Sequence, residues 1–350
     1  MTSPNPAVGA VLVAAGRAVG EGFHARAGAA HAEVEALGQA GAAARGATLY
    51  VTLEPCNHTG RTAPCVDAIT TAGVKRVVVA ISDPNPRVSG GGAAALSRSG
   101  VEVMIGCRER EAIAVNRVFI TAARRGRPHA TLKWAATLDG ATADARRASR
   151  WITGPEARIE AHRMRSYADA VVVGIGTALA DDPGLDVRLG RPWPREPFRV
   201  VVDTRARLPV SARLIGAGKP ERALVAITDA ADPERLKNLE TRGVTVLRCK
   251  SLEGHVDVSD LVSRLGALDV GGILVEGGGT LAWAFLEAGL VDRVVAFTAP
   301  KLLGGASSPR ALEGTGLLLP EAIRLEGICV RPVGTDWMME ADVVHQGVSA

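Results

Sequence analysis

Apolar and polar positions alternate along this chain in a rhythm that predicts strands separated by helices. In the first third, short apolar runs predict strands at Val8–Val13, Ala47–Leu53, Val77–Ile81 and Val101–Ile105. Helical spacing between and after them predicts helices at His31–Ala40, Cys65–Ala72, Ala93–Arg98 and Glu109–Ala123. This β-α-β-α-β order predicts a mostly parallel sheet with helices on both faces.

The second part of the chain resumes the alternation after a break. The basic stretch Arg124–Pro128 contains glycine and proline, which is typical of a linker and predicts two domains, residues 1–127 and 128–350. The strands expected in the second domain are Ala130–Trp134, Ala170–Val173, Arg199–Val202, Leu224–Ile227, Val244–Arg248, Ile273–Val275, Arg293–Phe297 and Trp337–Ala341. The helices expected there are Glu156–Ser166, Pro233–Thr241, Val258–Leu265 and Thr280–Ala288.

Length, composition and charge fit this division and narrow the class of protein. A chain of 350 residues favours two domains. Because 47% of the residues are hydrophobic but only 3% are aromatic, we expect cores built from Val, Leu, Ile and Ala. The net charge of +4 is mild and the charges are interspersed, which argues against a nucleic-acid binder and suits a small anionic ligand.

The sequence indicates a cytoplasmic protein without a membrane segment. No apolar run reaches the ~18 residues of a membrane span, and the segment after Met1 has neither the basic nor the apolar region of a secretory signal. Cysteine is too sparse for a disulfide framework. We expect Cys107 and Cys249 to be buried small apolar residues.

His31, Cys56 and Cys65 form the most informative pattern in the sequence. One imidazole and two thiolates supply three ligands of a tetrahedral zinc, and a fourth position left for water is typical of a catalytic site. Glu33 follows two residues after His31, where it can transfer a proton without binding metal. This H-x-E…P-C…C layout is the signature of zinc-dependent nucleobase deaminases, so the sequence predicts loss of ammonia from an aminopyrimidine-type ring.

The residues beside these ligands predict how they are held. Each cysteine follows a proline, which predicts that Cys56 and Cys65 open helices, where the helix dipole favours a thiolate. His31 is expected at the start of another helix. The intervening loop, Asn57–Pro64, is rich in hydrogen-bond donors. The alternative is a chance histidine with two core cysteines, and it requires three motifs to coincide.

The glycine-rich segment Val275–Thr280, at the end of a predicted strand in the second domain, is a candidate phosphate-binding turn. Backbone N–H groups between a strand and a helix can approach a phosphate closely. The spacing of Gly277, Gly279 and Ala282 matches the dinucleotide-binding fingerprint, but it comes late in the domain and no acidic residue ends the next strand. From the residues alone, a purely structural turn stays open.

Together with Asp83–Pro86, Lys133–Gly140 and Val173–Pro183, these motifs resemble the bifunctional deaminase/reductase of riboflavin biosynthesis over nearly the whole chain. The resemblance implies a cytidine-deaminase-like three-layer α/β/α domain with zinc, followed by a dihydrofolate-reductase-like α/β domain that uses NADPH. It implies deamination of 2,5-diamino-6-(5-phosphoribosylamino)pyrimidin-4(3H)-one and then reduction of its ribosyl group to ribityl.

The resemblance also assigns roles in the first domain. Glu33 is the catalytic residue, and the substrate contacts are Asn5, His24, His58 and Arg61, each of which is otherwise an ordinary polar loop residue. The family carries a helix ahead of the Thr2–Pro6 segment. We therefore expect one face of the first sheet to be uncovered unless another element takes the place of that helix.

In the second domain the resemblance assigns a nucleotide site and a substrate site, and we add two candidate catalytic residues, although a strand lysine and an Asp-Asp-Pro turn also have ordinary structural uses. Lys133 and Asp181 are candidates for polarising the sugar carbonyl or imine and handling its proton. The residues implied to line the nucleotide are Ala135, Trp151, Thr177, Asp181, Thr204, Gly278, Gly279, Thr280, Leu281, Ala282, Trp283 and Ala284. Those implied to line the substrate are Ser149, Arg165, Leu185, Arg188 and Glu276. The two arginines suit a 5′-phosphate, although Arg165 is also explained as a solvated helix charge.

Two other functions stay open on the sequence alone. One is a deaminase of another nucleobase, such as free cytosine or a tRNA base, joined to an unrelated second domain. The other is a non-catalytic nucleotide-binding module with a structural zinc, against which Glu33 and the set of only three ligands argue. The sequence allows a homo-oligomer without indicating one.

Overall fold

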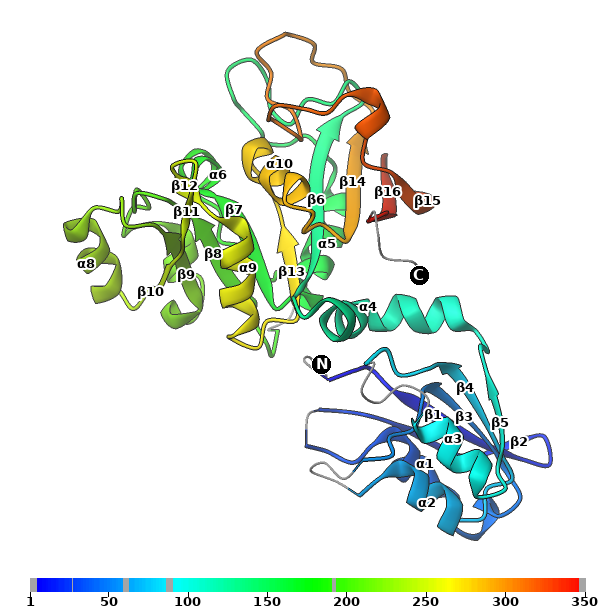
Figure 1. Ribbon diagram of the computed structural model, residues 1–350. Coiled ribbons are helices and arrows are strands. Elements are labelled where there is room, and N and C mark those ends of the chain that lie inside the picture. Colours follow the sequence, from blue (N-terminus) through cyan, green and yellow to red (C-terminus); the bar gives the residue numbers. More distant parts are fainter. Residues whose placement is uncertain (1–4, 27, 59–62, 86–90, 191–192, 346–350) are drawn as a thin grey trace. The chain divides into compact units, whose positions relative to one another are not determined.

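The computed structural model describes residues 5–26, 28–58, 63–85, 91–190 and 193–345 (Figure 1). The chain divides into two compact units, residues 1–127 and 128–350. In the described part of the chain, no helix is long and apolar enough to cross a membrane.

The first unit is built on a five-stranded sheet in the order β2-β1-β3-β4-β5. Its elements are β1 (Gly9–Ala14), β2 (Arg17–Phe23), α1 (Ala32–Ala40), β3 (Thr48–Leu53), α2 (Cys65–Thr71), β4 (Arg76–Ile81), α3 (Gly91–Arg98), β5 (Glu102–Ile105) and α4 (Glu109–Arg125). Strands β3, β4 and β5 run parallel, whereas β1 pairs antiparallel with both β2 and β3. The expected parallel pairing is present among β3, β4 and β5, whereas β1 and β2 form an antiparallel hairpin at one edge of the sheet.

Helices α1, α2 and α3 pack on one face of this sheet. Leu12, Leu49 and Val77 from three strands form a buried cluster with Ala36 of α1 and Ile69 of α2. Helix α4 packs on the other face through Ala112, Phe119 and Ile120, which contact the end of β4. These layers give the expected α/β/α arrangement.

The face that carries α4 is only partly covered. Tyr50 and Met104, which project from it, are each 42% exposed. A hollow of about 600 Å³ opens there, with Val11, Tyr50 and Val78 in its lining. Cys107 also lines the hollow and is half-buried, so the prediction that it is a core residue is wrong, whereas Cys249 is buried.

The second unit is built on a nine-stranded sheet in the order β10-β9-β8-β7-β13-β6-β14-β16-β15. Its strands are β6 (His129–Thr137), β7 (Ala170–Gly174), β8 (Phe198–Val202), β9 (Ala223–Ile227), β10 (Thr245–Arg248), β13 (Gly272–Val275), β14 (Arg293–Ala299), β15 (Leu325–Val333) and β16 (Asp336–Val343), with the short hairpin β11 (Ser251–Leu252) and β12 (His255–Val256) outside the sheet. Its α-helices are α5 (Pro155–Tyr167), α6 (Ile175–Asp181), α7 (Arg213–Gly216), α8 (Pro233–Thr241), α9 (Val258–Gly266) and α10 (Gly279–Glu287). All eight expected strands and four expected helices are present, with ends shifted by up to three residues, whereas β11, β12, β15, α6 and α7 are additional.

Helices cover both faces of the larger sheet. Helices α9 and α10 bury Leu261 and Phe285 on one face, and α8 buries Leu239 on the other. Strands β7 and β13 are neighbours in the sheet, but the chain continues from β7 to β8 on one side and from β13 to β14 on the other. A reversal of this kind leaves a crevice at the carboxyl ends of the strands, which is where α/β proteins bind ligands.

Candidate functional site

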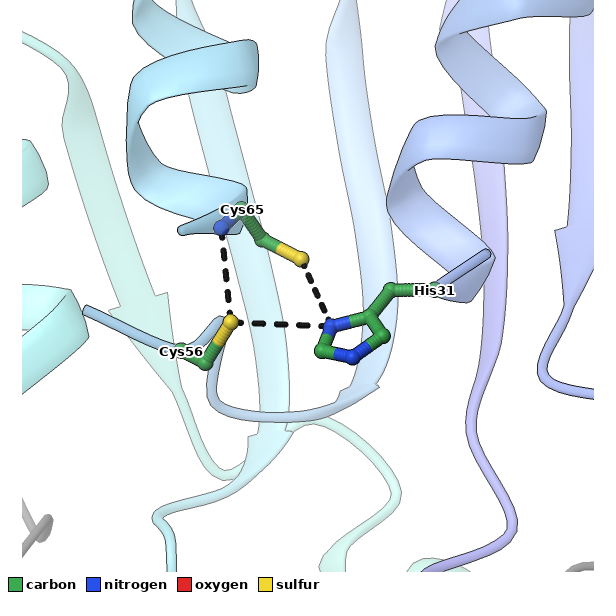
Figure 2. A group of neighbouring side chains, drawn as sticks. All are labelled: His31, Cys56 and Cys65. Carbon is green, nitrogen blue, oxygen red and sulfur yellow. Dashed lines mark hydrogen bonds between the residues drawn. The ribbon is translucent and has the colours of Figure 1, made fainter. Parts of the chain in front are cut away.

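His31, Cys56 and Cys65 converge in the first unit, as Figure 2 shows. His31 is the N-cap residue of α1, Cys65 is the first residue of α2, and Cys56 lies in the loop after β3. Of the two prolyl-cysteine pairs, only the second therefore opens a helix, and the prediction is wrong for Cys56. The loop still brings all three side chains to one point.

The distances between these side chains fit a zinc ion. His31 Nδ1 lies 3.1 Å from Cys65 Sγ and 3.5 Å from Cys56 Sγ, and the three ligand atoms lie within 4.8 Å of one another. Zn–S and Zn–N bonds of about 2.3 and 2.0 Å in a tetrahedron separate N and S by about 3.6 Å. Only small movements of the three side chains would place their ligand atoms at three corners of such a tetrahedron.

Electrostatics in this cluster also favour a cation. The hydrogen bond from Cys65 lowers the pKa of Cys56 to about 5, whereas the same bond and burial raise the pKa of Cys65. A thiolate at Cys56 is the form that binds zinc. Burial also raises the pKa of Glu33, which is 3% exposed and hydrogen-bonds to Cys65. A carboxyl with a raised pKa can both take and return a proton near neutral pH.

Two of the predicted substrate residues lie beside the cluster. The Asn5 amide lies 3.1 Å from His24 Nε2, and His24 Nδ1 lies 3.1 Å from the Ala30 carbonyl. The His24 ring meets the His31 ring edge-on, with centroids 5.6 Å apart. His58 is exposed at the end of the described part of its loop, and Arg61 lies outside the described residues.

The structure adds Glu54, to which the sequence analysis gave no role. This buried carboxylate directly precedes Pro55 and accepts hydrogen bonds from the backbone N–H groups of Asp83 (3.0 Å) and Ala93 (2.9 Å). Gly92 packs so closely on the Pro55 carbonyl that a Cβ would overlap it. Glu54 and Gly92 therefore fix the loop that presents Cys56. The one signal in the sequence that could have identified Glu54 is its position directly before the Pro55-Cys56 pair.

In the second unit, Lys133, Arg165 and Glu276 form a buried ion network. Arg165 Nε and Nη2 donate to the two carboxylate oxygens of Glu276 over 2.5 and 2.8 Å, and Lys133 Nζ lies 3.9 Å from the same carboxylate. Burial lowers the pKa of Lys133. Arg165 also donates to the Asp186 carbonyl, which joins the network to the segment that carries Leu185 and Arg188.

Asp181 belongs to a separate hydrogen-bonded group. Ser149 Oγ donates to its carboxylate over 2.7 Å, and the Arg150 guanidinium donates to its carbonyl. The neighbouring Trp151 ring is 62% exposed, with the Arg158 guanidinium 4.5 Å from its centroid. The two predicted catalytic residues thus have different partners: Lys133 pairs with Glu276, and Asp181 pairs with Ser149.

The glycine-rich turn lies at the carboxyl end of β13, where α10 begins. Gly277 and Gly278 have φ angles of +129° and +74°, which other residues rarely adopt. A Cβ on Gly278 would approach Thr177 Oγ1 to 3.3 Å, so the turn packs directly on α6. Its exposed backbone at a helix start fits a nucleotide phosphate. The side chains of Leu281 and Ala282 are buried in the core, so only their backbone can contribute.

The remaining predicted nucleotide residues lie near strand ends. Ala135 lies in β6, where it packs against a small core cluster beside Phe297. The carbonyl of Thr204, just after β8, is 3.3 Å from the Thr228 hydroxyl after β9. The two threonines follow β8 and β9, which are parallel neighbours. They therefore lie at the carboxyl ends of the strands, on the same edge of the sheet as the glycine turn.

Comparisons with known proteins relate each unit to a known family. Residues 128–339 match the RibD C-terminal domain, and residues 1–81 match the cytidine and deoxycytidylate deaminase zinc-binding region. The riboflavin biosynthesis protein RibD of Aquifex aeolicus is 46% identical over 303 residues, which cover 87% of this chain and 83% of that protein. The RibD protein of Escherichia coli is 43% identical over 314 residues, covering 87% and 84%.

Solved structures extend the likeness to both units. Acinetobacter baumannii RibD (form 1) superposes with a TM-score of 0.85 at 40% identity, covering 98% of this chain and 94% of that one. A diaminohydroxyphosphoribosylaminopyrimidine deaminase/5-amino-6-(5-phosphoribosylamino)uracil reductase from Thermotoga maritima gives 0.81 at 35% identity, covering 98% and 93%. This chain therefore belongs to the RibD family of riboflavin biosynthesis enzymes, which combine a deaminase with a reductase.

Proposed function

We propose that residues 1–127 deaminate 2,5-diamino-6-(5-phosphoribosylamino)pyrimidin-4(3H)-one with zinc, and that residues 128–350 then reduce its ribosyl group to ribityl with NADPH. The observation that carries the first half is the convergence of His31, Cys56 and Cys65 beside a buried Glu33. The second half is supported by the ion network around Glu276 and by the glycine turn at α10.

In the deaminase unit, Glu33 is the proton carrier. His31, Cys56 and Cys65 would hold a zinc ion, which when bound would lower the pKa of a water molecule to about 7. Glu33 takes a proton from water, whose oxygen adds to the ring carbon that bears the amino group. Glu33 then delivers the proton to the exocyclic nitrogen, so that the carbon–nitrogen bond breaks and ammonia leaves. Its raised pKa suits this role, since it must hold the proton between the two steps. Asn5 and His24 orient the substrate, because their side chains are already fixed beside His31.

In the reductase unit, the ion network changes the roles that the sequence predicted for Arg165 and Arg188. Both carboxylate oxygens of Glu276 already accept from Arg165, so this arginine is not available for bidentate binding of a phosphate. Arg188 is mostly exposed, with Asp186 as an ion-pair partner at 3.5 Å, and is the better candidate for the 5′-phosphate. We assign to Arg165 the task of holding Glu276 and, through it, Lys133.

Lys133 and Asp181 are the residues that act on the sugar. A bound NADPH supplies the hydride. Lys133 polarises the sugar carbonyl or imine, and Asp181, held by Ser149, handles its proton. The exposed Trp151 ring, backed by Arg158, offers a flat surface for the nicotinamide.

A coupled assay tests this proposal against its main rival. The chain is supplied with the deaminated ribosyl compound and NADPH, and absorbance at the nicotinamide band is followed. We expect NADPH oxidation that requires the compound. No oxidation, with ammonia still released from another nucleobase, would favour a deaminase joined to a second domain of different function.

We also propose a cytoplasmic enzyme that acts on a small molecule and forms homo-oligomers. A reducing compartment keeps Cys56 and Cys65 as thiolates for zinc. Strand β15 ends the larger sheet and carries Ile328 and Val330, which are 60% and 54% exposed. An edge strand with exposed apolar side chains is a common site for pairing with another copy. Light scattering of the purified chain would give its mass and contradict this proposal if it were that of one chain.

A further inference from the structure

Residues 301–314, here called the bridging segment, follow β14 and touch both ends of the proposed nucleotide site. At the start of the segment, Lys301 Nζ donates to the carbonyl oxygens of Trp151 (2.9 Å) and Ile152 (2.7 Å). The segment therefore holds the backbone that presents the Trp151 ring. Neither the motifs nor the residue pattern of the sequence marked this contact, since about 150 residues separate its partners.

The far end of the bridging segment packs on the glycine turn. The Glu313 N–H donates to the Gly279 carbonyl over 3.1 Å. A Cβ on Gly279 would come within 2.7 Å of the Arg310 carbonyl and of the Glu313 side chain. Gly314 lies directly against the Trp283 ring, where a Cβ would overlap it. Gly279 and Gly314 thus let the segment sit closely on the start of α10.

Asp139 fastens the middle of the bridging segment. Its carboxylate accepts the N–H groups of Leu303 (3.2 Å) and Gly304 (2.6 Å), and the Arg310 guanidinium donates to its carbonyl. The Thr137 hydroxyl donates to the same carboxylate over 2.5 Å. The hydrogen bond from Thr137 contributes most, and together these hydrogen bonds lower the pKa of Asp139 to about 2. At neutral pH the Asp139 carboxylate is therefore ionised and only accepts hydrogen bonds. Asp139 follows β6, the strand that contains Lys133.

We propose that Asp139 is a positioning residue for the nucleotide site: it anchors the bridging segment, which keeps Trp151 and the Gly279 turn at a fixed separation. This inference rests on the proposed nucleotide site. Asp139 acts through the segment and not on the nucleotide itself. If the anchor is lost, the site is correctly arranged for only a fraction of the time, and affinity falls by that fraction while bound nucleotide reacts at a nearly normal rate.

The test compares Asp139→Ala and Asp139→Asn with Asp232→Asn in the full chain. Asp232 is a matched control, because it also accepts two backbone N–H groups, those of Glu234 and Arg235, but caps α8. Titration with NADP⁺ gives the dissociation constant, and steady-state kinetics give KM for NADPH and kcat. Ammonia release reports that the first unit of the same molecules is intact, and tryptophan fluorescence reports that the second unit is folded.

We expect the alanine variant to raise the NADP⁺ Kd and the NADPH KM about tenfold or more, with kcat and ammonia release within about threefold. The asparagine variant keeps one acceptor oxygen and should raise both constants only about threefold. Lys301→Met should weaken binding in the same direction, and combining it with Asp139→Ala should change Kd by less than the product of the single effects.

Other outcomes separate this inference from the proposed function. An NADP⁺ Kd within twofold of wild type in the folded Asp139→Ala variant, or a loss confined to kcat, would overturn the role of Asp139. An equal weakening in Asp232→Asn would do the same, since it would reflect general destabilisation. Wild-type protein that binds NADP⁺ but does not reduce the deaminated compound would contradict the proposed function alone, because the binding comparison still tests Asp139.

Discussion

Replacing Glu276 by glutamine removes the anion that Arg165 and Lys133 share in the ion network of the second unit. The side chains of these two cations are 12% and 14% exposed, and that of Glu276 is 6% exposed. Glutamine keeps the shape of the side chain but leaves two buried positive charges without this partner. Removing one member of a buried ion pair is costly for that reason.

The magnitude follows from the pKa of Glu276. Burial alone would raise it, but the charges of Arg165 and Lys133 outweigh burial and hold it at about 2, against an ordinary value of 4.5. That depression corresponds to about 3 kcal/mol of folding free energy, within the range of about 3–5 kcal/mol for a broken buried pair. The contribution is complete above pH 4.5 and is lost as the pH falls towards 2. We therefore expect Glu276→Gln to lower the free energy of unfolding of this unit by about 3 kcal/mol at pH 7.

Tryptophan fluorescence during urea unfolding measures this unit selectively. All five tryptophans of the chain, Trp134, Trp151, Trp193, Trp283 and Trp337, lie beyond residue 127. Asp260→Asn is the control, because Asp260 pairs with the more exposed Arg264 and should cost less than about 1 kcal/mol. A Glu276→Gln variant within about 1 kcal/mol of wild type at pH 7 would refute the assignment of a buried, charged network. A difference that stays constant between pH 5 and pH 3 would refute it as well.

Three further predictions concern the first unit. Glu33→Gln should reduce ammonia release at least about 100-fold while elemental analysis still finds zinc, and loss of the metal would instead make Glu33 a structural residue. Cys65→Ser should bind zinc more weakly than wild type in competition with a chelator, because a hard hydroxyl replaces a thiolate ligand; unchanged zinc affinity would exclude Cys65 as a ligand. Gly92→Ala should also weaken zinc binding, since its new methyl group displaces the Pro55 carbonyl and the loop that presents Cys56; wild-type zinc affinity would show that the loop yields without moving its cysteine.

The strands that the apolar pattern missed have specific physical reasons. Strand β2 contains Gly20 and Gly22, which lie directly against α1 where a Cβ would overlap the helix backbone. Because its packing residues are glycines, β2 shows no apolar run. Strand β15 is exposed over most of its length, so it lacks the buried alternate positions that mark a strand, and its pairing with β16 supplies the backbone hydrogen bonds instead.

The parts of the candidate sites that could be predicted from the sequence are those whose residues lie close together along the chain. The spacing of His31 and Glu33 on one helix start, and of the two cysteines, is a short-range pattern that survives in the fold. The pairing of Arg165 with Glu276 spans 111 residues, and no local pattern indicates that it occupies both carboxylate oxygens. The contacts of Asp139 with Gly304 span 165 residues for the same reason. Sequence motifs therefore identified residue types, whereas the structure shows which groups hold them.

Mass spectrometry of the products tests the central claim most directly. The purified chain is incubated with the diaminopyrimidinone ribonucleotide, with and without NADPH. Without NADPH we expect one product in which an amino group has been replaced by oxygen, and with NADPH a second product that carries two additional hydrogens. Addition of two hydrogens without prior loss of the amino group, or no change to the compound under either condition, would contradict a deaminase followed by a reductase.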